Sequence, residues 1–122
     1  MADFRPKKVF AGKIKKEKNE KSLIELERTP DILYELGKKK GDKILVGFAA
    51  ETENLTDNAL KKLKEKKLDL IIANDISVKE AGFGSDKNRA RLINSKGTTL
   101  ELPLMPKIDM AEKILDEILK IK

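Results

Sequence analysis

The sequence predicts an α/β domain whose sheet is mostly parallel and covered on both faces. Residues 43–75 carry the pattern, with an apolar run at 44–48, a helical pattern at 55–67 and a second apolar run at 68–73. This order is typical of a strand, a crossover helix and a parallel strand. Neither run alternates strictly between apolar and polar residues, as expected of strands buried on both faces. We therefore expect this stretch to form the centre of the fold.

Polar residues at the ends of these two strands mark the expected site. The first run is followed by AAET at residues 49–52, and the second by Asn74 and Asp75. In open sheets of this kind, ligands bind outside the carboxyl ends of the strands. We therefore expect functional side chains in these two segments.

Two lysines of the predicted crossover helix are candidates for ligand contact. Leu55, Ala59 and Leu63 form an apolar stripe, and Lys62 and Lys66 lie four residues apart beside it. Their stems can lie along the sheet edge while the ammonium groups reach a ligand. A solvated lysine face is the ordinary alternative, and it suffices for the other lysines of this helix.

The composition excludes several kinds of chemistry. The 122 residues include no cysteine and no histidine, which excludes disulfides, thiolate nucleophiles, thiolate or imidazole zinc sites and histidine acid–base catalysis. The length fits one domain. The formal charge of +6 favours anionic partners without choosing among phosphates, nucleotides and nucleic acid. No apolar run is long enough to cross a bilayer and nothing resembles a signal peptide, so we expect a cytoplasmic protein without a membrane partner.

The elements before the centre are a basic segment, a strand and a helix. Residues 1–21 are basic and irregular, for which a mobile loop is the ordinary interpretation. SLIELE at 22–27 predicts a short strand. Thr29-Pro30-Asp31 gives an N-cap, a proline at the first helical position and an acid in the first turn, so a helix is expected to begin there. We expect this helix to end near Gly37.

A loop, a hairpin and a final helix are expected after the centre. The glycine-containing loop at 76–88 is too long for a simple turn, and a functional role and ordering by Phe83 are equally fair interpretations. Residues 89–94 and 98–104 predict a hairpin. Pro106 opens the last helix. Its expected core-facing residues recur at helical spacing: Ile108, Ala111, Ile114, Leu115, Ile118 and Leu119.

Familiar phosphate-binding and metal-binding patterns are absent from the sequence. It contains neither GxxxxGK[ST] nor GxGxxG. Glu51, Asp75 and Asp86 could in principle meet a magnesium ion carried by a nucleotide, but this trio is weak as an isolated metal site. We therefore expect no metal site formed by the protein alone.

Several segments match, in order, the motifs of one known family. They are ADFRP (2–6), KIKK (13–16), TPDIL (29–33), VGFAAET (46–52), ANDIS (73–77) and GF with SD and Asn88 (82–88). Through them, almost the whole chain resembles the phosphopantothenoylcysteine synthetase family, the synthetase half of a bifunctional coenzyme A biosynthesis protein. The resemblance implies a Rossmann-like three-layer sandwich with a mostly parallel sheet, truncated on its amino-terminal side and followed by a carboxy-terminal β-hairpin and helix.

The resemblance also implies a nucleotide-activated ligation. In that family, 4'-phosphopantothenate attacks the α-phosphate of CTP to give an acyl-cytidylate and pyrophosphate, and the amine of cysteine then displaces CMP. Bacterial enzymes use CTP as the co-substrate with Mg²⁺ or Mn²⁺, whereas the eukaryotic type uses ATP. The implied protein partners are a second copy, giving a homodimer, and a fused or associated flavin-dependent decarboxylase.

Site residues follow from the resemblance by position. Those implied to bind the nucleotide are Asp3, Lys13, Pro30, Asp31, Ile32, Leu33, Phe48, Lys62 and Lys66. Lys13 is also the implied catalytic residue of the acyl-nucleotide step. Lysines suit this chemistry because they stabilise the charge of a triphosphate most strongly in a water-poor cleft. The helix expected to begin at Pro30 offers backbone N–H groups to an anion, and Phe48 is expected to end its strand facing the site.

The family's amino-terminal portion, with its glycine-rich loop, has no counterpart in the sequence. We expect residues 1–122 to be the carboxy-terminal portion of a synthetase domain, with 1–21 as a basic active-site loop and 22–122 as the α/β core. Such a chain is expected to keep nucleotide-binding elements without completing the ligation alone. The alternative is a basic nucleic-acid-binding module. It is disfavoured because the chain has few aromatic residues and no RNA-binding signature.

Overall fold

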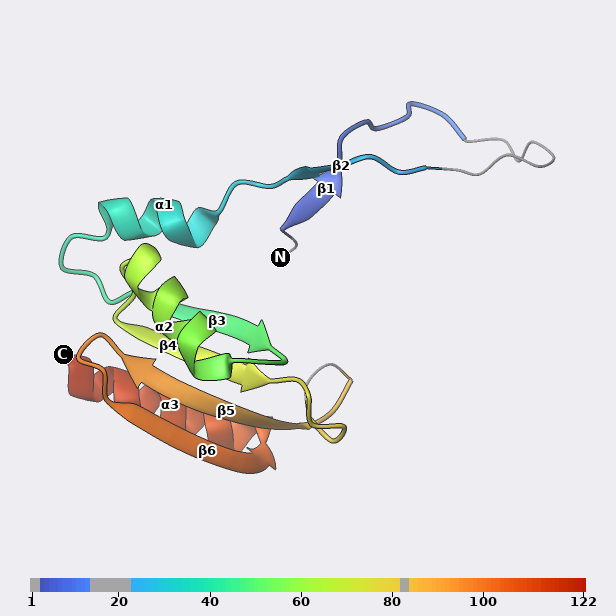
Figure 1. Ribbon diagram of the computed structural model, residues 1–122. Helices are drawn as coiled ribbons and strands as arrows, with labels where there is room; N and C mark the ends of the chain where they lie inside the picture. The colour runs from blue at the N-terminus through green and yellow to red at the C-terminus, as the bar shows by residue number, and fades with distance from the viewer. Residues whose placement is uncertain (1–2, 14–22, 82–83) are drawn as a thin grey trace. The chain divides into compact units, whose positions relative to one another are not determined.

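The structure, a computed structural model, describes residues 3–13, 23–81 and 84–122. It divides into two compact units, residues 1–32 and 33–122. A two-stranded sheet lies in the first unit, and a four-stranded sheet with helices lies in the second (Figure 1). Several residues of the sequence interpretation lie outside the described part: Ala2, the IKK of the KIKK segment, Ser22, Gly82 and Phe83.

The first unit is a short antiparallel ribbon. β1 (Phe4–Pro6) pairs with β2 (Leu26–Arg28), which covers only the end of the strand predicted at 22–27. Because β2 pairs with β1, it belongs to the first unit. Two ion pairs cross the ribbon at 2.7 Å, Arg5 with Glu27 and Lys7 with Glu25. Exposed pairs of this kind stabilise a fold little.

The second unit is built on one sheet in the order β3-β4-β5-β6. Its strands are β3 (Val46–Glu51), β4 (Leu70–Asp75), β5 (Lys87–Asn94) and β6 (Thr99–Pro106). β3 and β4 run parallel and are joined by α2 (Leu55–Glu65), as predicted. The α/β fold with a hairpin and a final helix is confirmed. The expectation of a mostly parallel sheet is wrong, because the hairpin extends the same sheet. Among the described residues, one of the sheet's three pairings is parallel and two are antiparallel.

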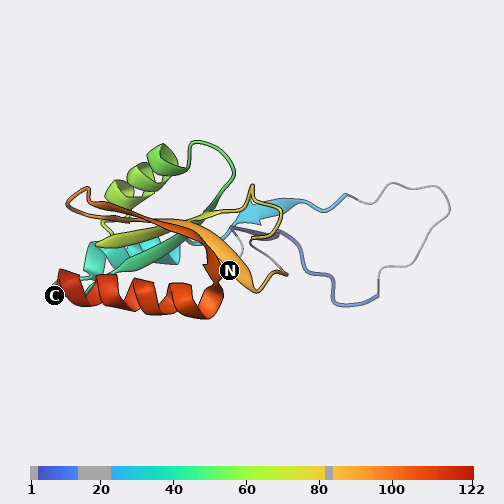
Figure 2. The same cartoon turned by 90° about the horizontal axis from the view of Figure 1, so that it is seen from below.

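Two helices cover opposite faces of this sheet (Figure 2). Ile71 and Ala73 of β4 pack with α2, whereas Leu70 and Ile72 pack with α3 (Lys107–Ile121). Successive residues of a strand point to opposite faces, so a strand covered on both sides needs a continuous apolar run. This explains why β4 shows no polar alternation.

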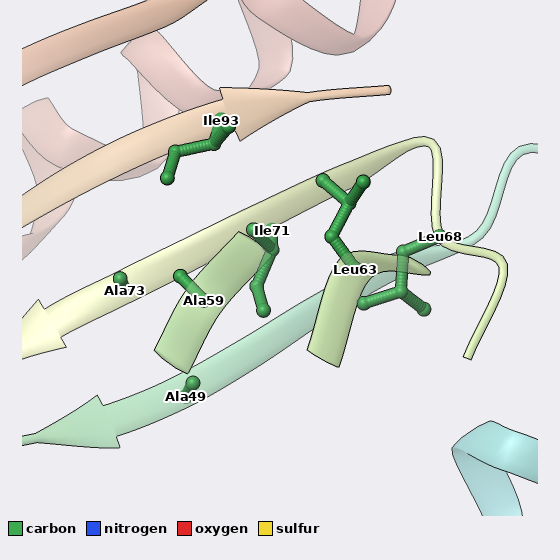
Figure 3. Packing of buried hydrophobic residues seen from close by; sticks show 7 residues of the cluster. All are labelled: Ala49, Ala59, Leu63, Leu68, Ile71, Ala73 and Ile93. Atoms are coloured by element: carbon green, nitrogen blue, oxygen red, sulfur yellow. The ribbon is translucent and has the colours of Figure 1, made fainter. Parts of the chain in front are cut away.

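Small residues let α2 lie close to the sheet. Ala59 of α2 is fully buried, and Ala49 and Ala73 of the strands beneath are buried as well. Figure 3 shows this cluster, with Ala59 and Leu63 of the helix beside Ile71 of β4. This close packing fixes the orientation of α2 about its own axis. It thereby sets which side chains of α2 lie next to the carboxyl ends of the strands.

The first helix, α1 (Ile32–Lys39), begins and ends later than predicted. Pro30 precedes the helix, and the expected end at Gly37 is wrong. Gly37 is buried inside α1, where a Cβ would lie 2.0 Å from the carbonyl oxygen of Lys66. Glycine is therefore required by the close approach of α1 to the end of α2, and the turn beyond the helix uses Gly41, with φ of +54°.

The last helix, α3, buries only part of the predicted stripe: Ile114 and Ile118 pack against the sheet as predicted, whereas Ile108, Leu115 and Leu119 do not. Its buried or half-buried apolar residues are Met110, Ile114, Ile118 and Ile121. Its exposed apolar residues are Ile108, Ala111, Leu115 and Leu119. The helix is apolar on two sides, so periodicity alone does not decide which side meets the sheet.

Across the described residues, no helix is both long enough and apolar enough to cross a bilayer.

Candidate functional site

The carboxyl end of β3 holds a carboxylate in contact with an ammonium group. Glu51 ends β3, and its Oε1 accepts a hydrogen bond from Nζ of Lys62 at 2.6 Å. Its Oε2 accepts a hydrogen bond from Nδ2 of Asn58 at 3.2 Å. Asn58 and Lys62 lie four residues apart on α2, so both project from one side of the helix. We call Glu51, Asn58 and Lys62 the strand-end cluster.

The two charged groups of this cluster are unequally exposed. The side chain of Glu51 is 11% exposed and that of Lys62 is 42% exposed. The carboxylate of Glu51 is mostly buried and accepts a hydrogen bond on each oxygen, so its position is fixed. An ammonium group has three N–H donors, and Glu51 accepts one of them. The cluster therefore presents a positioned cation to a ligand at the carboxyl end of the parallel strands.

Lys66 shares a side of α2 with Lys62, as predicted, but it is not part of this cluster. It is the half-buried cap residue of α2, and its backbone N–H donates to the carbonyl of Lys62 at 3.0 Å. It lies one turn further along the helix. Because α2 runs back toward the amino ends of the strands, Lys66 is further from the end of β3 than Lys62.

The polar side chains at the end of β4 make hydrogen bonds that stabilise the strand end and the turn after it. Oδ1 of Asn74 accepts a hydrogen bond from Nδ2 of Asn88 at 2.8 Å, which ties β4 to the start of β5. Oδ1 of Asp75 accepts hydrogen bonds from the backbone N–H and the hydroxyl of Ser77, at 3.1 and 2.5 Å. The ANDIS segment thus stabilises the turn that leaves the sheet.

Two of the predicted nucleotide residues occupy unexpected places in the second unit. Phe48 does not end its strand: it lies in the middle of β3 and is 63% exposed. Because Ala49 faces α2, alternation places Phe48 on the opposite face from the strand-end cluster. Leu33 packs against the core beneath α2, so its side chain serves packing.

The remaining predicted residues belong to the first unit. Asp3 and the segment before α1 are brought together by the ribbon, since the carbonyl of Asp3 accepts a hydrogen bond from the N–H of Thr29 at 2.9 Å. The exposed side chains there are those of Asp3, Pro30, Asp31 and Ile32. Lys13 is also exposed and lies on the connection between β1 and β2.

A pocket of about 550 Å³ lined mainly by β5 and β6 contains arginines that sequence reasoning missed. Its lining includes Asp75, Arg89 and Arg91. The guanidinium of Arg91 donates to Thr56 and Glu101, whereas its Nε is buried without a partner among the described residues. The signal was present in the sequence, because two arginines two positions apart in a strand face the same side.

The acidic residues do not assemble a metal site in the described part of the chain. Those residues contain no group of three or more Asp or Glu side chains able to hold an ion. Glu51 is bound to Lys62, and Asp75 to Ser77. In the described part of the chain, these contacts direct both carboxylates to protein groups.

Two lysines on exposed helix surfaces have raised pKa values. A hydrogen bond to Glu35 raises the pKa of Lys38, and one to Glu117 raises the pKa of Lys120. Both are neighbouring pairs on α1 and α3. They stabilise helix surfaces and do not mark a site.

Together, the fold and the strand-end cluster define an α/β domain with a positioned cation at the carboxyl end of a parallel strand pair. Residues 1–121 match the family DFP, described as the DNA/pantothenate metabolism flavoprotein C-terminal domain. The chain belongs to this family, which confirms the resemblance found in the sequence motifs.

Relatives agree with this assignment. The Coenzyme A biosynthesis bifunctional protein CoaBC of Bacillus subtilis (strain 168) is 52% identical over 118 residues, which are 97% of this chain and 29% of that protein. CoaBC of Borreliella burgdorferi is 44% identical, over 94% of this chain and 29% of that protein. The crystal structure of a CoaBC C-terminal domain gives a TM-score of 0.69 at 42% identity, over 80% of this chain and 46% of that one. The chain therefore spans less than a third of these two curated relatives.

Proposed function

We propose that the chain supplies the nucleotide-binding part of a CTP-dependent phosphopantothenate–cysteine ligase of coenzyme A biosynthesis. Family membership and the names of the relatives support the pathway. The structural observation that carries the proposal is the Glu51–Lys62 pair at the carboxyl end of β3. A cation fixed where α/β sheets bind their ligands suits a triphosphate.

The proposed reaction has two steps. A carboxylate oxygen of 4'-phosphopantothenate attacks the α-phosphorus of CTP, and the bond to pyrophosphate breaks to leave an acyl-cytidylate. The amine of cysteine then attacks the acyl carbon, loses a proton and displaces CMP, which forms the amide. Negative charge grows on the phosphate oxygens in the first step, so positioned cations lower its barrier.

Each predicted site residue has a place in this proposal. Lys62 and Lys66 bind the phosphates, and Lys13 acts as the catalytic lysine of the acyl-nucleotide step. Asp3 and the segment from Pro30 to Leu33 contact the nucleotide, with Leu33 acting through its backbone because its side chain is packed in the core. Phe48 lies on the face of β3 opposite the strand-end cluster, so it is assigned to the base and not to the phosphates. Mg²⁺ or Mn²⁺ arrives bound to the phosphates of CTP.

The partners of the proposed ligase follow from the family. Two relatives are named bifunctional, which supports a fused or associated flavin-dependent decarboxylase in proteins of this type. A homodimer and a cytoplasmic location complete the proposal, and analytical sedimentation of the chain checks the dimer.

A titration tests the nucleotide assignment. Isothermal calorimetry with CTP and Mg²⁺ is expected to show saturable binding at one site per chain, with ATP as the comparison nucleotide. Binding of single-stranded oligonucleotides, weakening steeply with salt and indifferent to CTP, would instead support the nucleic-acid module. Absence of CTP binding under all conditions contradicts the proposal.

A chimera tests the reaction. The chain replaces the matching 118 residues of the Bacillus subtilis relative, to which it is 52% identical. We expect pyrophosphate release that requires both phosphopantothenate and CTP, followed by CMP release that requires cysteine. The matched control carries Lys62→Met. Activity equal in both proteins would remove the strand-end cluster from the mechanism.

A further inference from the structure

We propose that Glu51 is a positioning residue, which holds the ammonium group of Lys62 ready for an anionic ligand. The inference rests on the proposed function, because it takes that anion to be the nucleotide's phosphates. It assigns a role to a carboxylate that would otherwise oppose phosphate binding by its charge.

The contacts of Glu51 show a carboxylate fixed on both oxygens. Oε1 accepts from Lys62 at 2.6 Å and Oε2 from Asn58 at 3.2 Å. The same Asn58 amide donates to the backbone carbonyl of Glu53 at 3.1 Å, which ties the cluster to the turn between β3 and α2. Glu51 is therefore anchored by the strand, the turn and the helix together.

A held lysine binds an anion at lower entropic cost than a free one. The lysine stem has four rotatable bonds, and a mobile side chain loses that freedom when it binds. The contact with Glu51 restricts the stem beforehand, as preorganised sites do. Lys62 then keeps the remaining N–H donors of its ammonium for a ligand.

A second lysine–carboxylate pair in the same unit shows what a purely structural pair looks like. Nζ of Lys40 contacts both oxygens of Asp69, at 2.6 and 2.7 Å, and Asp69 also accepts the backbone N–H of Leu45. Its two side chains are about equally exposed, at 23% and 20%. In the Glu51–Lys62 pair the carboxylate is mostly buried and the lysine side chain is accessible. An anionic ligand can therefore reach the lysine.

Amine labelling tests whether Glu51 holds Lys62. The chain is treated with limiting acetic anhydride, and the acetylation rate of each lysine is read by mass spectrometry. In Glu51→Gln we expect Lys62 to react several-fold faster, with Lys61 and Lys40 unchanged. Unchanged Lys62 reactivity would overturn the inference, because the carboxylate would then not restrain the ammonium group.

A double-mutant cycle tests whether the pair acts as a unit on CTP. Glu51→Gln is expected to weaken CTP binding by about 3- to 10-fold, the size of one lost charge-assisted contact. Lys62→Met should weaken it at least as much, and the double variant no further. Asp69→Asn is the matched control, expected to lower the thermal midpoint without changing CTP affinity.

The outcomes separate the two claims. Additive losses in the double variant, or tighter binding in Glu51→Gln, overturn the positioning role while leaving nucleotide binding intact. If the unsubstituted chain does not bind CTP, the proposed function fails and the anion-binding part of the inference fails with it. The labelling result then still decides whether Glu51 restrains Lys62.

Discussion

At the scale of residues, the VGFAAET segment combines tight packing with an ion pair on one face of β3. Gly47 has no room for a side chain, since a Cβ would lie 2.6 Å from Cδ1 of Leu68 and 3.0 Å from Cδ2 of Leu33. Ala49 is buried under α2, and Glu51 binds Lys62. Alternate residues of the segment therefore have two roles: the small ones allow close packing, and Glu51 holds Lys62 of α2 at the end of β3.

Gly37 gives a prediction about stability at this scale. Gly37→Ala should lower the free energy of unfolding by about 1–3 kcal/mol, because the added carbon meets the Lys66 carbonyl in a packed site. Urea unfolding followed by circular dichroism measures the change. Gly12→Ala is the control, since a Cβ there meets nothing within 4 Å. Equal midpoints for the two variants would show that α1 does not approach α2 as described.

At the scale of elements, α3 shows that amphipathic patterning leaves a choice open. Its two apolar sides have similar periodicity, and only contact with the sheet selects Met110 and Ile114 for burial. Leu115, one position further along, is 60% exposed. Burial here depends on the neighbouring layer and not on the helix alone.

Adjacent residues of α3 provide a direct test of this orientation. Ile114→Ala should cost about 2–4 kcal/mol of stability, because it removes buried methylene groups and leaves a cavity. Leu115→Ala should change stability by less than about 0.5 kcal/mol, as exposed substitutions usually do. Thermal and urea unfolding of both variants measure the difference. The reverse order of effects would mean that the side of α3 carrying Leu115, and not the side carrying Ile114, faces the sheet.

At the scale of the whole molecule, the proposed site residues are divided between the two units. Asp3, Lys13 and the residues from Pro30 to Ile32 belong to the first unit, whereas Phe48, Lys62 and Lys66 belong to the second. The proposal assigns Lys13 of the first unit to the acyl-nucleotide step, and Lys62 and Lys66 of the second unit to the phosphates. Substitutions of Lys13 and of Lys62 should therefore change different kinetic constants.

Lys13 and Lys62 test this division of roles in the chimera. Lys13→Gln should reduce the rate of pyrophosphate release more than the affinity for CTP, because Lys13 is assigned to the transition state. Lys62→Met should chiefly raise the CTP concentration required for half-maximal rate. Steady-state kinetics combined with CTP titration measure both effects. Equal losses of rate and affinity in Lys13→Gln would assign that residue to binding alone.

The sequence by itself determined the parallel β3-α2-β4 unit, the hairpin, the final helix and the family. Local periodicity and turn residues are sufficient for these features, because strands and helices impose their repeats on neighbouring positions. It also pointed to the carboxyl ends of β3 and β4, and to Lys62 beside the buried stripe of α2. These parts of the candidate site follow from order along the chain.

Only the tertiary structure decided which groups meet. It joined Glu51 to Lys62 across eleven positions, placed Phe48 on the other face of β3, buried Gly37 against the Lys66 carbonyl and chose the inner side of α3. Each of these depends on the distance and packing of a second element, which a repeat pattern within one element does not contain. Periodicity therefore specified the elements, and contact between elements specified the burial of α3 and the partner of Lys62.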